Sequence, residues 1–211
     1  MLTPTQLKIF GTFGKDTFKE YSFKELKRAA HATSNSLVQN ATAAFIKEGL
    51  VTSRKVGTTR LYKLNHRNDK AYDYLRLHNH EKLPREAHDS ISIIQEQVDK
   101  ETTFYSLVVF GSYATGTQTE ESDLDVAAII PDEKTRKNVE VALNTASNRT
   151  PLKLDHHTIT AEELKKMLFT DHENLGKEIA RKNLPVHNPA TFYRLLVRIS
   201  SHGWNPLPGT G

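Results

Sequence analysis

Hydrophobic positions recur at helical spacing through the first third of the chain. They predict one helix that begins at Pro4, a second that is capped by Ser22 with Glu25 completing a capping box, and a third that begins near Ser34. Gly49 is placed to end the third helix in a left-handed conformation. The predicted inward side chains of this helix are Leu37, Ala41, Ala44 and Phe45.

The pattern then changes from helical spacing to alternation. Residues 50–56 and 60–64 read as two short strands around Gly57-Thr58-Thr59, which predicts a hairpin. Three helices followed by a two-stranded hairpin resemble a winged helix-turn-helix, and the resemblance spans residues 1–65.

Polar and basic side chains mark this segment as a candidate nucleic-acid surface. Residues 1–66 contain 11 Lys and Arg against 4 Asp and Glu, whereas the whole chain has a net charge of only +4. We expect contact with DNA or RNA, although winged helices also serve as protein-docking or dimerisation units. The outward face of the third helix carries Asn35, Ser36, Gln39, Asn40 and Thr42, of which the first four are candidate contacts together with Arg54, Lys55 and Arg60 in the hairpin.

Residues 66–100 contain no strand pattern. Apolar residues again recur at helical spacing, with a break at Pro84 and a second stripe from Ala87 to Val98. We therefore expect a helical connector here.

A turn with the chemistry of an anion site follows. The apolar run 104–110 ends abruptly at Gly111-Ser112, and a strand that stops there and opens a short helix presents backbone N–H groups and a hydroxyl to a phosphate. Beyond it, Asp123 and Asp125 lead into a second apolar strand and share one side of it, about 7 Å apart. Two such carboxylates repel unless a cation lies between them, and Mg²⁺ fits that position.

A later segment supplies a third carboxylate. Residues 152–159 alternate, so that Lys153, Asp155 and His157 share one face of a predicted strand. If that face looks toward the first two carboxylates, Asp155 joins them in a two-metal site that transfers a nucleotidyl group in line.

The string GSYATGTQTEESDLDVAAII resembles the signature of the DNA polymerase β nucleotidyltransferase superfamily, especially its minimal members. The resemblance continues through the strand of Asp155 to the helical tail ENLGKEIARKNLPV and covers about residues 101–187. It implies a mixed sheet packed by helices on one face, an NTP bound with Mg²⁺ or Mn²⁺, and release of pyrophosphate. It assigns the β- and γ-phosphates to Gly111 and Ser112 and the metal to Asp123, Asp125 and Asp155; further candidate nucleotide contacts are Gly116, Ser122, Lys153 and His157.

Composition limits the class of protein. The chain is 37% hydrophobic and 26% charged, and it lacks an export signal and any apolar stretch long enough to span a membrane. The absence of cysteine excludes disulfides and thiolate chemistry, so we expect a soluble, cytoplasmic protein. The predicted fold class is α+β, with a winged helix-turn-helix at 1–65, a helical connector at 66–100, and a nucleotidyltransferase domain with a helical tail at 101–211.

Three functions remain open. The first is an enzyme that moves NMP from an NTP to a hydroxyl of a nucleic acid held by the winged helix. The second is nucleotidylation of a protein hydroxyl, as in antitoxin-type relatives of the superfamily. The third is a DNA-binding regulator whose nucleotide domain senses its ligand without reaction.

Overall fold

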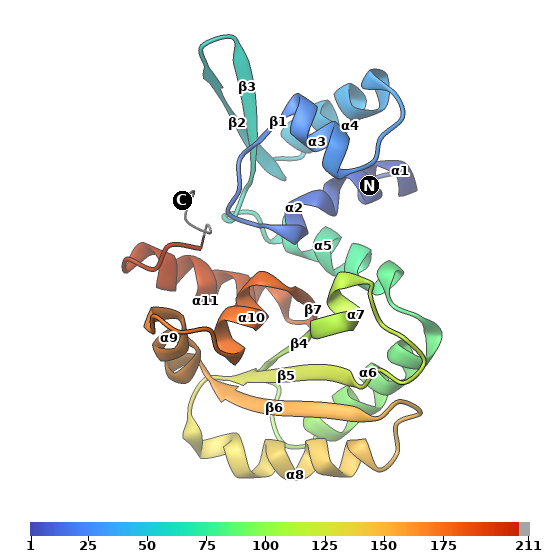
Figure 1. Ribbon diagram of the computed structural model, residues 1–211, viewed down its shortest axis with the longest axis vertical. Coiled ribbons are helices and arrows are strands. Elements are labelled where there is room, and N and C mark those ends of the chain that lie inside the picture. The colour runs from blue at the N-terminus through green and yellow to red at the C-terminus, as the bar shows by residue number, and fades with distance from the viewer. Residues whose placement is uncertain (207–211) are drawn as a thin grey trace. The chain divides into compact units, whose positions relative to one another are not determined.

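The computed structural model describes residues 1–206, which fall into two compact units (Figure 1). The first consists mainly of Met1–His78, and the second is Asn79–Trp204. The division lies within the segment 66–100, and residues 207–211 of the expected second domain lie outside the described residues. Within residues 1–206, no helix combines the length and the apolarity that crossing a bilayer requires.

The first unit is a set of helices with a small sheet. Its elements are α1 (Pro4–Phe10), α2 (Thr12–Lys15), β1 (Tyr21–Ser22), α3 (Phe23–Ala29), α4 (Asn35–Lys47), β2 (Val51–Val56), β3 (Thr59–Leu64) and the larger part of α5 (Asp69–Lys82). The predicted capping box is present, since the Ser22 hydroxyl accepts from the Glu25 N–H and the Glu25 carboxylate accepts from the Ser22 N–H. Ser34 caps α4, and Gly49, at φ +67°, follows its end.

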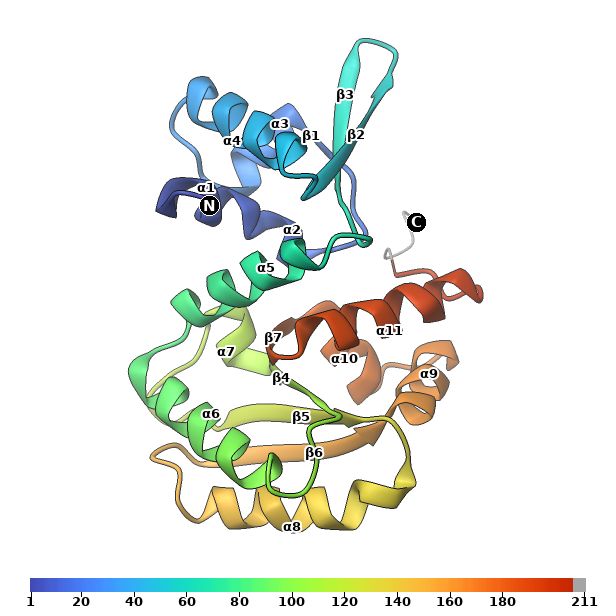
Figure 2. The same ribbon diagram turned by 180° about the vertical axis from the view of Figure 1, so that it is seen from behind.

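The hairpin is tighter than the sequence pattern suggested. Its turn consists of Gly57 and Thr58 alone, because Thr59 pairs with Val56 as the first residue of β3. Gly57 takes φ +57°, the left-handed conformation that two-residue hairpin turns require. β1 pairs antiparallel with β3, which gives a three-stranded sheet in the order β1-β3-β2 (Figure 2).

Aromatic rings fill the core of the first unit. Phe10 and Phe45 pack edge-on with ring centroids 5.1 Å apart, and Phe13 lies against both. The predicted faces of α4 are wrong at two positions. Leu37 is exposed and Val38 is buried in its place, and Thr42, expected to face outward, is buried with its hydroxyl donating to the Val38 carbonyl. Val38, Ala41 and Phe45 recur at three and four residues, so they form the buried stripe without Leu37.

The second unit is built on a four-stranded sheet in the order β6-β5-β4-β7. β5 and β6 are parallel, while β4 is antiparallel to both of its neighbours. The predicted α+β class and mixed sheet packed by helices are therefore confirmed. Its elements beyond α5 are α6 (Arg85–Val98), β4 (Ser106–Phe110), α7 (Gly111–Thr115), β5 (Leu124–Ile130), a 3-10 turn (Glu133–Thr135), α8 (Arg136–Ser147), β6 (Leu154–Thr160), α9 (Ala161–Phe169), α10 (Leu175–Arg181), β7 (Asn183–His187) and α11 (Pro189–Ser201).

The last strand, β7, differs from the prediction, because the sequence analysis continued a helical tail through this segment. α10 ends at Arg181, and Asn183–His187 forms β7 against β4. Pro185 cannot continue a helix, but it is tolerated at a sheet edge because its missing N–H is not needed there. Leu184 and Val186 are buried on either side of it, so the strand contributes to the core.

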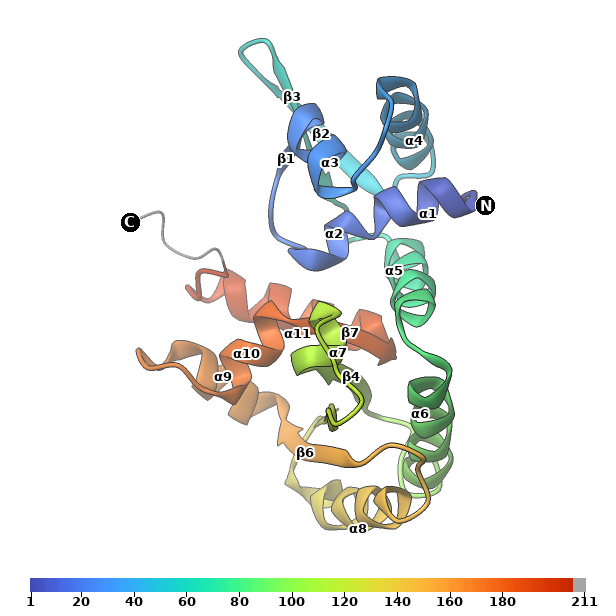
Figure 3. The ribbon, with the colours of Figure 1, turned by 45° about the vertical axis from the view of Figure 1, so that its right-hand side comes forward.

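Helices lie on both faces of the sheet rather than on one (Figures 1 and 3). α6 and α8 pack against one face, where Leu124 and Val126 belong to the main hydrophobic cluster. The opposite face of β5 presents Asp125 and the buried Ala127 and Ile129, with α10 and α11 on that side. Asp125 therefore lies on the face of the sheet opposite α6 and α8.

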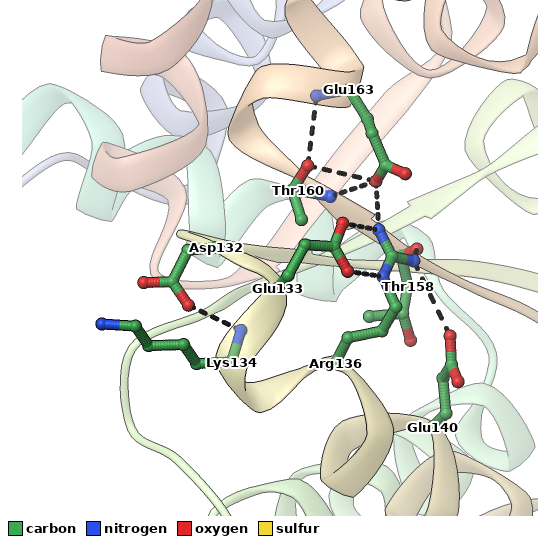
Figure 4. Close-up of polar contacts among 8 residues, drawn as sticks. All are labelled: Asp132, Glu133, Lys134, Arg136, Glu140, Thr158, Thr160 and Glu163. Carbon is green, nitrogen blue, oxygen red and sulfur yellow. Dashed lines mark hydrogen bonds and ion pairs between the residues drawn. The ribbon is translucent and has the colours of Figure 1, made fainter.

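A single guanidinium ties α8 to β6 and α9 (Figure 4). Arg136 donates to the Glu133 carboxylate at 2.6 Å, to the carbonyl of Thr158 at 2.6 Å and to the Glu163 carboxylate, and its side chain is only 22% exposed. Glu163 also accepts from the backbone N–H of Thr160, which caps α9. These contacts hold the end of β6 on the side where no further strand pairs with it.

We expect Arg136→Ala to lower the free energy of unfolding by about 2 kcal/mol, because it removes the hydrogen bond to the Thr158 carbonyl and the ion pairs with Glu133 and Glu163. Urea unfolding followed by circular dichroism measures the change. Lys137→Ala, an exposed change on the same helix, is the control and should cost less than about 0.5 kcal/mol. Equal effects of the two variants would contradict the role given to Arg136.

Candidate active site

The glycine turn at the end of β4 brings the backbone against a carboxylate. Gly111 takes φ +63° at the start of α7, a left-handed conformation that disfavours other residues. A Cβ on Gly111 would lie 2.0 Å from Oδ2 of Asp125, so only glycine permits this approach. The predicted turn thus sits directly beside the predicted carboxylates.

The parallel pairing of β5 with β6 sets two aspartates side by side. Asp125 and Asp155 are register partners, and paired residues on parallel strands point to the same face. Asp123 precedes β5 by one residue and lies two positions before Asp125. Burial raises the pKa of Asp125, and the neighbouring carboxylates of Asp155, Glu178 and Asp123 raise it further. The site therefore favours a cation.

Basic groups of the chain itself already meet two of these carboxylates. Nζ of Lys153 lies 2.6 Å from Oδ2 of Asp123, and this hydrogen bond raises the pKa of Lys153. Nε2 of His157 lies 3.4 Å from Oδ1 of Asp155. Both side chains come from β6 or the residue before it and share the face of Asp155, as predicted.

The three aspartates share one face but are not gathered into a metal cluster. Across residues 1–206, no three His, Cys, Asp or Glu side chains are arranged to hold a metal ion. Mutual repulsion of the carboxylates and the hydrogen bond from Lys153 to Asp123 both oppose such a cluster. The donor set nevertheless fits a divalent metal, because three carboxylates are hard oxygen ligands and an ammonium group already stands against one of them.

Two other predicted nucleotide contacts have structural roles in the loop after α7. Gly116, at φ +74°, ends α7 in the left-handed conformation. The Ser122 hydroxyl accepts from the N–H of Thr119 at 2.9 Å, which closes the loop before β5. Ser112 is half-buried in the first turn of α7, beside the approach of Gly111 to Asp125.

The candidate nucleic-acid residues all lie on the first unit, and Asn35, Ser36, Gln39, Asn40, Arg54, Lys55 and Arg60 are exposed. Asn35 already accepts from Nζ of Lys27 at 2.8 Å. Arg54 is held by Glu20 through a bidentate ion pair, with Nε 2.9 Å from Oε1. Lys55 and Arg60 are direct cross-strand partners in the hairpin, and such like charges repel.

Two residues near the site were missed by the sequence analysis. Glu178 on α10 is close enough to raise the pKa of Asp125, and Arg136 anchors the outer side of β6. Glu178 lies within the tail ENLGKEIARKNLPV but was given no role there, and Arg136 belongs to no motif. A cavity of about 420 Å³ also lies along β6, with His156 and His157 in its wall.

A glycine turn beside paired carboxylates on a mixed sheet defines a site for the transfer of phosphate-bearing groups. Residues 91–187 match the family of the nucleotidyltransferase domain, so this part of the chain carries such a domain and the protein is a transferase of that class. The chain is also similar to a chain of the solved structure described as "Crystal structure of the toxin-antitoxin with AMP-PNP", with 16% identity and a TM-score of 0.36 over 53% of this chain and 84% of that one. No curated protein matches it.

We expect Gly111→Ala to destabilise the second unit by about 2 to 3 kcal/mol and to abolish nucleotidyl transfer, because the new methyl group displaces Asp125. Gly57→Ala is a control, since it carries a similar left-handed strain but has open space where its Cβ would lie and is no candidate site residue. It should cost about 1 kcal/mol and retain activity. Urea unfolding measures the stability of both variants, and pyrophosphate release measures their activity. Equal losses of stability and activity in the two variants would contradict the clash between the new methyl group and Asp125.

Proposed function

We propose that the second unit transfers NMP from an NTP to an acceptor hydroxyl with release of pyrophosphate. The observation that carries this proposal is the register of Asp125 with Asp155, directly beside the Gly111 turn. The match of residues 91–187 to the nucleotidyltransferase domain supports the same reaction class.

In the proposed reaction the acceptor oxygen attacks the α-phosphorus, the bond to the β-phosphate oxygen breaks, and the hydroxyl proton passes to water. Asp123, Asp125 and Asp155 would hold Mg²⁺ or Mn²⁺, which when bound neutralises phosphate charge and lowers the pKa of the attacking hydroxyl. Gly111 and Ser112 would bind the β- and γ-phosphates. Lys153, 80% exposed at its side chain, can turn from Asp123 to the triphosphate.

We also propose that the first unit is a winged helix-turn-helix that binds nucleic acid. Helices α1 to α4 before the hairpin, the strand order β1-β3-β2 and the exposed polar residues of α4 support this assignment. Lys55 and Arg60 support it further, because two cations placed opposite each other gain a shared partner in a phosphate backbone. Arg54 contributes less, since Glu20 already neutralises it.

Labelled NTP distinguishes the remaining acceptors. The full chain is incubated with α-³²P-NTPs, Mg²⁺ and, in separate reactions, DNA, RNA or protein. Label on an oligonucleotide indicates a nucleic-acid acceptor, and label on protein alone indicates protein nucleotidylation. Duplex binding without pyrophosphate release under any condition leaves a regulator that only senses nucleotide.

We expect Asp155→Asn to reduce nucleotidyl transfer by about 100-fold or more, because the third carboxylate is lost from the face of Asp125. Asp171→Asn removes an exposed carboxylate after α9 and should change the rate less than twofold. Quantified transfer of label checks both. Full activity of Asp155→Asn would contradict the assignment of the third carboxylate.

We expect duplex binding to weaken with salt, and Lys55→Gln with Arg60→Gln to reduce the slope of log K against log salt by about 1.8, because two phosphate contacts are lost. Lys8→Gln, an exposed change on α1, should leave the slope unchanged. Fluorescence anisotropy at several salt concentrations measures these slopes. The same slope in the wild type, the double variant and Lys8→Gln would count against the hairpin as a phosphate contact.

A further inference from the structure

Two adjoining cavities lie at the end of β5 that α9 and α11 flank (Figure 2). The larger has a volume of about 470 Å³ and the smaller about 250 Å³, and Pro131, Ala161 and Leu195 line both. Asp125 lies near the start of β5, whereas Ile130, in the wall of the larger cavity, is its last residue, roughly 16 Å further along the strand. The cavities are therefore separate from the candidate active site.

The larger cavity is apolar, and among the described residues none that lines it is charged. Ile129, Ile130 and Tyr105 form its buried wall. The Tyr105 hydroxyl donates to the Asp99 carboxylate at 2.9 Å, so the polar end of this ring is already engaged. Phe104 also lines the cavity and is 77% exposed. An apolar ligand would cover aromatic surface that the described residues leave in contact with water.

One stripe of α11 borders both cavities and changes in character along the helix. Its members recur at helical spacing: Thr191, Leu195, Arg198 and, just past the end of the helix, His202. Thr191 lines the larger cavity, Arg198 and His202 line the smaller one, and Leu195 separates them. The stripe therefore runs from an apolar chamber to a basic one.

The smaller cavity carries a surplus positive charge, because two cations and one carboxylate line it. Nζ of Lys165 lies 3.8 Å from Oε2 of Glu162, so these two charges balance each other. The guanidinium of Arg198 is exposed and forms no hydrogen bond or ion pair with the described residues. Arg198 is thus the cation that is available to a ligand.

We propose that the two cavities together bind a small amphipathic carboxylate, with its apolar body in the larger cavity and its carboxylate on Arg198. A guanidinium binds a carboxylate through two parallel N–H···O bonds. A purely apolar molecule would gain nothing from Arg198, and a small polar anion would gain nothing from the apolar chamber. The larger cavity lies within the range of about 300 to 1,000 Å³ that is typical of small-molecule sites.

The backbone around the larger cavity favours a small molecule over an extended peptide. Ile129 pairs with Ser106 of β4 on one side and with Ile159 of β6 on the other. The strand that forms the wall therefore has no free edge to which a further strand could add. Side chains alone contact the ligand there. The inference does not depend on the proposed nucleotidyl transfer.

The test titrates the full chain with hexanoate, octanoate and naphthoate, and with the alcohols of the same carbon skeletons, followed by NMR of the isoleucine methyl groups. We expect the carboxylates to bind about tenfold more tightly than the matching alcohols, because only they pair with Arg198. Arg198→Gln should lower the affinity for the carboxylates about tenfold and leave that for the alcohols unchanged. Arg85→Gln removes an exposed guanidinium of α6 and should change neither affinity.

A second variant tests the location of the site. Leu195→Trp places a larger side chain in the wall that the two cavities share, and it should abolish binding of carboxylates and alcohols alike. Leu195 is half-buried, and thermal unfolding checks that the variant is folded. In the wild type, the probes should shift the methyl resonances of Ile129 and Ile130 and leave those of Ile91 on α6 unchanged.

Three outcomes would overturn the proposal. The first is that no probe shifts the methyl resonances of the cavity at any concentration up to its solubility. The second is equal affinity for carboxylates and alcohols, which would remove the role of Arg198. The third is binding that a folded Leu195→Trp variant leaves unchanged, which would place the probes elsewhere on the molecule.

Discussion

The parallel register of β5 and β6 is the constraint on which the second unit depends. It sets Asp125 level with Asp155 and is continued by the hydrogen bond from the N–H of Leu124 to the carbonyl of Lys153. A slip of one residue would turn Asp155 toward the helices α6 and α8, since side chains alternate along a strand. Leu124 and Leu154, buried against those helices, make that slip costly. The hydrophobic face thus determines the position of the carboxylates on the opposite face.

Features that depend on neighbouring residues were predictable from the sequence. The capping box at Ser22, the left-handed Gly49, and the strands at 106–110 and 124–130 each follow from a few adjacent residues. β7 was missed because its five residues follow a helical pattern directly, and only Pro185 signals the change. The exposed Leu37 was misplaced because helical spacing fixes which residues share a stripe but not which stripe meets the core.

The shared strand face of some candidate residues was predictable, but their contacts were not. Alternation placed Lys153, Asp155 and His157 on one face of a strand, and β6 with the residue before it has them so. That these residues form a functional site with Asp123, Asp125 and the Gly111 turn stays a prediction. The hydrogen bond between Lys153 and Asp123 joins residues 30 apart and exists only once two strands are in register. The same holds for Arg54 with Glu20 and Arg136 with Thr158, which pair across elements whose packing no local pattern encodes.

The ammonium of Lys153 acts as an internal counter-ion for Asp123. If Asp123 holds a divalent ion as proposed, a bare ion would have to displace this tethered cation. An ion already chelated by a triphosphate would offer the ammonium oxyanions in exchange, so the two displacements would offset each other. On the proposed function, Lys153 would therefore couple the binding of metal to that of nucleotide.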